Sequence, residues 1–163
     1  MSKPTKYYSE LQENRISGYL GWHTVVGSGA TPTKPGDIYS EQWLGECKTH
    51  TKKSDKVVFK LEHWLKIKKE AQSKFKYPVL FVDNGTQDIH YTWCLIDYSL
   101  CCPLGATLVN VNMRPATNSI TIPASIPLQS ITCPIIQVGF TVTALAGDSL
   151  GIVSLFDFYK YFC

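Results

Sequence analysis

Asp37, Glu46 and Lys48 are the residues of this chain whose types and spacing point most directly to chemistry. Carboxylate oxygens and main-chain carbonyls are the ligands that Mg²⁺ takes from proteins. An ammonium group beside such a cation can orient a water molecule and stabilise negative charge that develops on a phosphate. Two carboxylates with a nearby lysine therefore predict a site that hydrolyses a phosphodiester with the help of a divalent cation.

A predicted β-hairpin positions this set. Its strands are expected at residues 37–39 and 43–49. Alternate side chains of a strand point to the same face, so Glu46, Lys48 and His50 share one face of the second strand. Two adjacent charges on a face directed at the core are unfavourable unless something compensates for them. A divalent cation would do so.

Asp37 can lie across the hairpin from Glu46, and both carboxylates can then bind one Mg²⁺ ion. The main-chain carbonyl of Cys47, between Glu46 and Lys48, is a natural third ligand. The side chain of Cys47 is expected on the opposite face of the strand, so we do not expect a thiol nucleophile.

The remaining pattern predicts an α/β core over residues 1–100. Apolar residues at helical spacing indicate helices, and alternating or continuous apolar runs indicate strands. In chain order the expected elements are a helix at 5–20, a strand at 22–26, the hairpin, a short strand at 57–59, a helix at 61–75, and strands at 79–83 and 91–100. Residues 101–163 are expected to form a β-rich extension that packs on the core or forms a subunit interface. Short strands are expected in residues 103–147 and a closing helix at 150–162.

Positive charge is concentrated in the middle of the chain. Residues 48–76 contain ten lysines and three acidic side chains, whereas residues 1–47 contain four basic and five acidic ones. Clustered lysines attract polyanions such as nucleic acid, and a solvated helix face is the alternative interpretation. Two ion pairs are expected on the outside of the 61–75 helix, Glu62 with Lys66 and Glu70 with Lys74.

With these motifs the chain resembles the PD-(D/E)XK nucleases, in which "PGD" (residues 35–37) and "ECK" (residues 46–48) would form the signature. The "GSG" at residues 27–29 is similar to the corresponding segment of archaeal Holliday-junction-resolving enzymes and their phage-encoded relatives. The resemblance covers about residues 8–98. It implies a restriction-endonuclease-like core, with a central mixed sheet flanked by helices, and says nothing of the C-terminal extension.

The resemblance also implies a role for each matching residue. Asp37 and Glu46 would be metal ligands and Lys48 the catalytic lysine, with Mg²⁺ as the cofactor and Mn²⁺ able to replace it. The family's first helix usually supplies a glutamate that reaches the metal through water. Glu13 is the predicted residue, with Glu10, one turn earlier, as the alternative.

A further group of residues is predicted to contact DNA. Ser28 and its flanking glycines can bind a phosphate through backbone N–H groups and the hydroxyl, or form only a flexible turn. The basic side chains near the motifs are the other candidates. The predicted DNA contacts are Arg15, Ser28, Lys34, His50, Lys52 and Lys53.

The function implied by the resemblance is a Mg²⁺-dependent endonuclease that hydrolyses DNA, in its narrower form a Holliday-junction resolvase. Since a junction needs two cuts, a resolvase would be a homodimer. One alternative is a repair or restriction nuclease without preference for junctions. The other is a non-catalytic DNA-binding protein that keeps the nuclease fold.

The expected location is the cytoplasm, that of the host cell if a phage encodes the protein. The first residues are polar, and no uncharged apolar run is long enough to cross a membrane, so no membrane partner is expected. The six cysteines include no C-x-x-C pair, which predicts reduced, mostly buried thiols in place of zinc ligands or disulfides.

Overall fold

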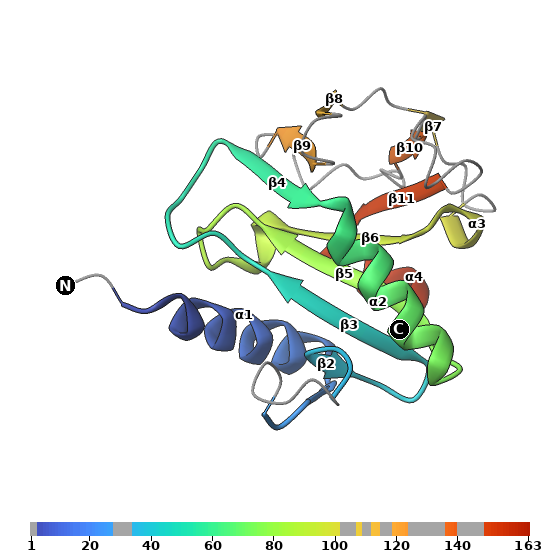
Figure 1. The fold of residues 1–163 in the computed structure, drawn as a ribbon, viewed down its shortest axis with the longest axis horizontal. Coiled ribbons are helices and arrows are strands. Elements are labelled where there is room, and N and C mark those ends of the chain that lie inside the picture. Colours follow the sequence, from blue (N-terminus) through green and yellow to red (C-terminus); the bar gives the residue numbers. More distant parts are fainter. Residues whose placement is uncertain are drawn as a thin grey trace.

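The computed structural model describes residues 3–27, 34–101, 107–108, 112–114, 119–123, 136–139 and 149–163. In these residues eight strands form one mixed sheet, three more form a smaller antiparallel sheet, and helices cover both faces of the large sheet. The predicted α/β fold is confirmed at this level (Figure 1).

The elements have the following bounds. The strands of the large sheet are β1 (His23–Thr24), β2 (Ile38–Tyr39), β3 (Trp43–Lys48), β5 (Tyr77–Asp83), β6 (Thr92–Asp97), β7 (Thr107–Leu108), β10 (Ile136–Gly139) and β11 (Ser149–Ser154), in the spatial order β1-β2-β3-β5-β6-β11-β10-β7. The small sheet contains β4 (Lys56–Lys60), β8 (Asn112–Arg114) and β9 (Ser119–Pro123), in the order β4-β9-β8. The helices are α1 (Thr5–Leu20), α2 (Leu61–Ser73), α3 (Tyr98–Cys101), α4 (Leu155–Phe162) and the 3₁₀ turn η1 (Ile89–Tyr91). Within the described ranges no helix is both long and apolar enough to span a bilayer.

The large sheet has a separate apolar core on each face. Strand β5 shows the division, because Leu80 and Val82 belong to one core, whereas Val79 and Phe81 belong to the other. Helix α2 and strand β4 pack on the first face, and α1 and α4 pack on the second. A strand that is buried on both faces needs a continuous apolar run, which is what residues 79–82 supply.

Strands β3 and β5 run parallel and are joined through β4 and α2. A parallel pair requires such a crossover, and α2 packs its apolar stripe against the sheet. The buried residues of this stripe are Leu61, Trp64, Ile67 and Ala71. The crossover therefore fixes α2 beside β3, the strand that holds the "ECK" motif.

Most predicted elements of the first hundred residues are confirmed. The helix at 5–20 is α1, the hairpin is formed by β2 and β3, and the strand at 79–83 lies within β5. The strand predicted at 91–100 is shorter, since β6 ends at Asp97 and α3 follows.

The closing helix predicted at 150–162 is wrong in its first part. Residues 149–154 form β11, which pairs antiparallel with β6, and α4 begins only at Leu155. Leu150 and Ile152 face one core and Val153 faces the other, so this segment is buried on both faces as a strand. The Ser154 hydroxyl then caps α4 by accepting a hydrogen bond from the Asp157 N–H.

Strand β11 and helix α4 are thus part of the sheet and core formed by the first hundred residues. Phe158 of α4 packs against Trp43 and Phe81 at ring-centroid distances of 4.9 and 5.8 Å. The domain boundary predicted at residue 100 stays a prediction, and much of the extension lies outside the described residues.

Three cysteines among the described residues are free thiols. Cys47 and Cys94 are buried in the core on the α1 side, and Cys163 is exposed. These three agree with the prediction of reduced thiols.

Helix α2 ends in a Schellman motif that has a phenylalanine where glycine is preferred. The Phe75 N–H donates to the Gln72 carbonyl at 3.1 Å, and the Lys76 N–H donates to the Ala71 carbonyl at 2.9 Å. Phe75 has φ 56°, and its side chain is 99% exposed. A non-glycine residue is strained in this region, and no burial compensates for the strain.

We therefore predict that Phe75→Gly raises the free energy of unfolding by about 0.5 to 1 kcal/mol, after allowing for the greater freedom of glycine in the unfolded chain. Urea denaturation measures the change. Gly21→Ala is the matched opposite, because Gly21 ends α1 with φ 71° and a Cβ there would meet no atom within 4 Å. That substitution is expected to lower stability by about 1 kcal/mol. Equal signs for the two variants would contradict this account of the helix ends.

Candidate active site

Strand β2 pairs with only part of β3, and this leaves an open edge beside the "ECK" motif. The register runs from Tyr39 opposite Leu44 to Ile38 opposite Gly45. The Asp37 N–H then donates to the Gly45 carbonyl at 2.8 Å, and the Asp37 carboxylate accepts the Cys47 N–H at 2.8 Å. Asp37 is therefore held at the point where β3 loses its neighbouring strand.

A cavity of about 550 Å³ opens at this edge. It lies between α1, the segment before β2, strand β3 and helix α2. All four predicted catalytic residues, Glu13, Asp37, Glu46 and Lys48, line it. The remaining lining residues are Lys6, Ser9, Glu10, Asn14, Thr24, Val25, Gly27, Lys34, Gly36, Cys47 and Lys66.

The Glu46 carboxylate is almost completely buried and is paired with two lysines. Its side chain is 3% exposed and points, with Leu44, to the α2 side of the sheet. Lys48 Nζ lies 2.6 Å from Oε1, and Lys66 Nζ lies 3.2 Å from Oε2. The charge on this face is thus compensated by two ammonium groups, one from the same strand and one from α2.

The two glutamates of α1 differ in their surroundings. Glu13 is half-buried, and burial together with the charge of Asp37 raises its pKa to about 7. Glu10 is exposed and forms an ion pair with Lys6 at 3.7 Å. Both line the cavity, but only Glu13 is partly withdrawn from water toward the other carboxylates, which favours it as the helix carboxylate of the site.

Burial and neighbouring charges shift the other groups of the site. Burial, with the charge of Glu46, raises the pKa of Asp37. Burial lowers the pKa of Lys48, but the charge and hydrogen bond of Glu46 outweigh it, so the net shift is upward and Lys48 stays an ammonium. Burial raises the pKa of the Cys47 thiol well above its usual range. A neutral, buried thiol is a poor nucleophile, as the sequence pattern also indicates.

The carboxylates that line the cavity are oxygen donors of the kind that a divalent cation takes. Among the described residues no three His, Cys, Asp or Glu side chains are grouped closely enough to hold a metal. The predicted set needs fewer, namely Asp37, Glu46 and the Cys47 carbonyl. That carbonyl points to the open edge, because the N–H and C=O of one strand residue point to the same side and the Cys47 N–H contacts Asp37. Glu13 lines the same cavity.

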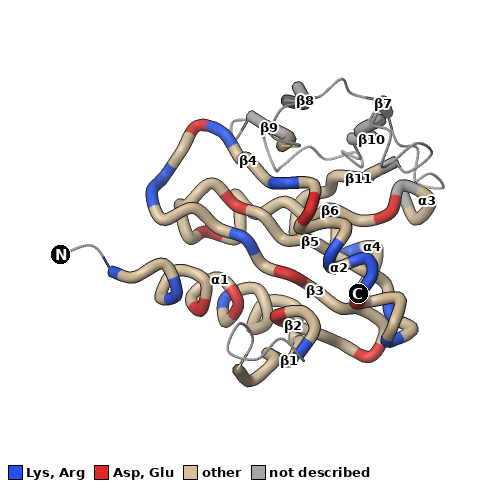
Figure 2. The backbone as a smooth tube through the Cα atoms, in the orientation of Figure 1, with Lys and Arg blue, Asp and Glu red and all other residues tan. Residues whose placement is uncertain are grey.

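Of the predicted DNA contacts that the structure describes, only Lys34 lines the cavity, and it donates to the Val26 carbonyl at 2.5 Å. Lys52 and Lys53 are exposed in the loop between β3 and β4, where Figure 2 shows a group of basic residues. Ser28 lies outside the described residues.

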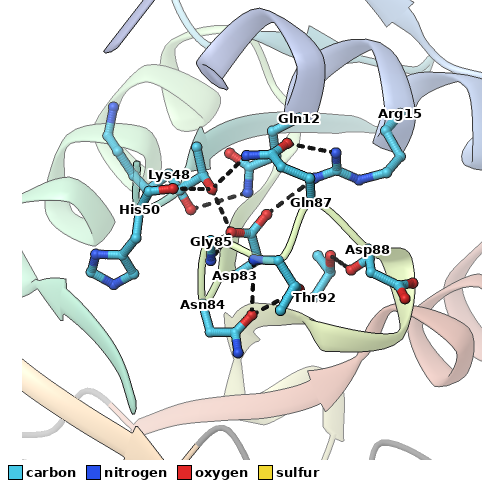
Figure 3. Close-up of polar contacts among 12 residues, drawn as sticks. Gln12, Arg15, Lys48, His50, Asp83, Asn84, Gly85, Gln87, Asp88 and Thr92 are labelled. Atoms are coloured by element: carbon cyan, nitrogen blue, oxygen red, sulfur yellow. Dashed lines mark hydrogen bonds and ion pairs between the residues drawn. The ribbon is translucent and has the colours of Figure 1, made fainter. Parts of the chain in front are cut away.

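The other two predicted contacts do not line the cavity. His50 accepts the Val58 N–H at its ring Nε2, at 3.4 Å. Arg15 is half-buried, 3.1 Å from the Asp83 carboxylate and 2.7 Å from the Gln87 side-chain oxygen. Figure 3 shows this network, which joins α1 to the end of β5.

Two residues that the sequence interpretation did not select also reach the site. Gln12 is buried, and its Nε2 donates to the Lys48 carbonyl at 3.0 Å. Its position four residues before the buried Ile16 was a usable signal, because both fall on one helix face. Lys66 carried no such signal, since its contact depends on where α2 lies relative to β3.

One member of each ion pair predicted on α2, Lys66 and Glu70, instead contacts the hairpin or the segment before it, and Glu62 pairs with Lys60 at 3.6 Å. Lys66 pairs with Glu46 and lies 3.8 Å from Glu70, and Glu70 accepts the Gly36 N–H at 3.0 Å. The i,i+4 rule considers only neighbours on one helix. In the structure this face of α2 turns toward the hairpin, which supplies closer partners.

In comparisons with known proteins, no family model, curated protein or solved structure matches the chain. The description of the site therefore depends on its own geometry, which is a cavity at an open strand edge. Four carboxylates line it, Glu10, Glu13, Asp37 and Glu46, together with four lysines, Lys6, Lys34, Lys48 and Lys66.

The Arg15–Asp83 pair generates a first prediction for this region. The Asp83 side chain is fully buried, so Arg15→Met leaves a carboxylate without its cation and should lower the free energy of unfolding by about 3 kcal/mol. Lys6→Met, which removes an exposed ion pair, is the control and should change stability by less than about 1 kcal/mol. Urea denaturation distinguishes the two. A small effect of Arg15→Met would mean that the arginine is free for another role.

Glu13 generates a second prediction. Because its pKa is raised, the folded state binds a proton more tightly than the unfolded state, and stability falls as the pH rises from about 4.5 to about 7. In EDTA, Glu13→Gln should therefore be more stable than the natural chain by about 1 kcal/mol at pH 8, given solvent screening of this half-exposed group, and should lose the advantage at pH 4. Glu10→Gln should show a smaller dependence on pH. Parallel stability curves for all three proteins would refute the assignment.

Proposed function

We propose that the chain is a Mg²⁺-dependent endonuclease that hydrolyses DNA phosphodiester bonds, with a restriction-endonuclease-like core of the PD-(D/E)XK type. The observation that carries the proposal is that Glu13, Asp37, Glu46 and Lys48 line one cavity although they come from three separate elements. The mixed sheet with helices on both faces agrees with the core that the sequence resemblance implies.

Asp37, Glu46 and the Cys47 carbonyl would hold the cation, and Glu13 would face it from α1. A divalent cation, when bound, supplies positive charge against the negative charge that develops on the phosphate. Lys48 is kept charged beside Glu46 and can orient the attacking water or stabilise the phosphate oxygens. The Cys47 N–H fixes the Asp37 carboxylate, so the donor oxygens are positioned before substrate arrives.

The distribution of charge supports a polyanionic substrate. The lysines of the 48–76 segment lie at the end of β3, in the loop to β4, at the two ends of β4, and on and just after α2 (Figure 2). Two of them, Lys48 and Lys66, line the cavity. Clustered lysines attract a phosphate backbone regardless of its sequence. Cleavage of four-way junctions by a homodimer is the narrower form of this proposal, because each protomer would make one of the two cuts.

Lys48→Met tests the catalytic assignment. A labelled linear duplex, a flap and a four-way junction are incubated with the protein and Mg²⁺, and the products are separated by electrophoresis. The natural chain should cut at least one substrate, and Lys48→Met should reduce the rate by at least about 100-fold, because it removes charge stabilisation specific to the transition state. Lys69→Met removes an exposed lysine of the same segment that does not line the cavity, so it should lower the rate only slightly, through weaker attraction of DNA.

The outcomes separate the alternatives. Preferential cleavage of the junction supports a resolvase, and equal cleavage of all three substrates supports a general nuclease. Salt-sensitive DNA binding with no Mg²⁺-dependent product from the natural chain supports a non-catalytic binding protein and overturns the proposal. Circular dichroism checks that Lys48→Met is folded.

A further inference from the structure

Both oxygens of the Glu46 carboxylate contact an ammonium group. Lys48 Nζ lies 2.6 Å from Oε1, and Lys66 Nζ lies 3.3 Å from Oε1 and 3.2 Å from Oε2. Glu46 is also one of the two carboxylates proposed to hold the divalent cation. The lysines and the cation would therefore use the same oxygens.

The two lysines already over-compensate Glu46, since one negative charge meets two positive ones. A divalent cation adds two further positive charges at this carboxylate. Like charges so close in a partly buried site repel, and the cation would compete with both ammonium groups for the lone pairs of the same two oxygens. This repulsion favours the departure of one ammonium group when the cation binds.

Lys66 is the lysine that can leave more easily. Its contacts with Glu46 are longer than that of Lys48, and its side chain is 54% exposed, against 37% for Lys48. It also has an alternative partner, because Glu70 lies one helical turn further at 3.8 Å and is held in place by the Gly36 N–H. Lys48 is only two residues from Glu46 on the same strand and has no second acidic partner within 4 Å among the described residues.

We propose that Lys66 is an exchangeable cation, which occupies Glu46 in the metal-free protein and is released to bind a DNA phosphate when a divalent cation takes its place. This inference rests on the proposed function and assigns to the site a coupling between its metal and its substrate. The cation frees an ammonium for DNA, and DNA draws the ammonium away from Glu46. By linkage, each ligand then strengthens the binding of the other to the same extent.

Titration calorimetry with Mn²⁺, in the absence of DNA, tests the first half of the proposal. Lys66→Met removes the competitor for Glu46, so it should bind Mn²⁺ roughly fivefold more tightly than the natural chain. Lys69→Met removes the same charge from an exposed position of the same helix and should leave the affinity nearly unchanged. Glu46→Gln should abolish the binding that Lys66→Met strengthens, which assigns the signal to this carboxylate.

Fluorescence anisotropy with a labelled duplex tests the second half, with Ca²⁺ used as a cation that can occupy the site. Ca²⁺ should tighten DNA binding by the natural chain and by Lys69→Met. With Lys66→Met the enhancement should be smaller, and the slope of log K against log salt in Ca²⁺ should decrease by about 1, as expected for one lost phosphate contact.

The proposal therefore requires Lys66→Met to bind Mn²⁺ more tightly and also to show a smaller effect of Ca²⁺ on DNA binding. A lysine with a purely structural role would not produce both changes. Equal or weaker Mn²⁺ binding by Lys66→Met, or an undiminished effect of Ca²⁺ on its DNA binding, overturns the inference. If Lys66→Met behaves as expected but the natural chain cuts no DNA, the exchange stands and the nuclease proposal fails. If the natural chain cuts DNA and Lys66→Met matches Lys69→Met in both assays, only the exchange fails.

Discussion

The burial of Glu46 at an open strand edge is the constraint on which the rest of the site depends. A carboxylate that is 3% exposed is unfavourable unless cations compensate for it, and β3 provides only Lys48, because the other neighbour on the same face is Leu44. The second, Lys66, comes from α2. That helix is held beside β3 by apolar residues such as Trp64 and Ile67, so the packing of the core determines where the charge is placed.

Helix α2 also helps to position the segment that holds Asp37. Glu70 accepts the N–H of Gly36, the residue before Asp37. Gly36 has φ 67°, and a Cβ at this position would lie 2.8 Å from the Leu44 side chain, so both the conformation and the space require glycine. Helix α2 thus contacts Glu46 of β3 through Lys66 and the residue before Asp37 through Glu70, although α2 is not adjacent to either carboxylate in sequence.

The sequence was sufficient for the parts of this arrangement that depend on local pattern. The alternation of β3 placed Glu46 and Lys48 on one face, and the hairpin spacing placed Asp37 near them, as found. It was not sufficient for Lys66, because nothing in a helix pattern says which strand its polar side will meet. It also failed for residues 149–154, where an apolar run that is buried on both faces as a strand can equally be taken as part of a helix.

The carboxylates of the cavity differ in the positive charge around them. Glu46 contacts two lysines, whereas Glu13 and Asp37 have raised pKa values, and one bound cation would affect both groups. Burial and the neighbouring carboxylates raise the pKa values of Glu13 and Asp37, so nearby positive charge would stabilise the ionised forms of both groups. Glu46, in contrast, is a single carboxylate that contacts two ammonium groups, those of Lys48 and Lys66. A divalent cation held by Asp37 and Glu46 would supply positive charge that lowers the pKa values of the nearby carboxylates, and under the proposed exchange it would take the place of Lys66 at Glu46. The released Lys66, whose side chain is 54% exposed, would then be available to a DNA phosphate. In this proposal, the redistribution of charge that accommodates the metal would also favour the binding of DNA.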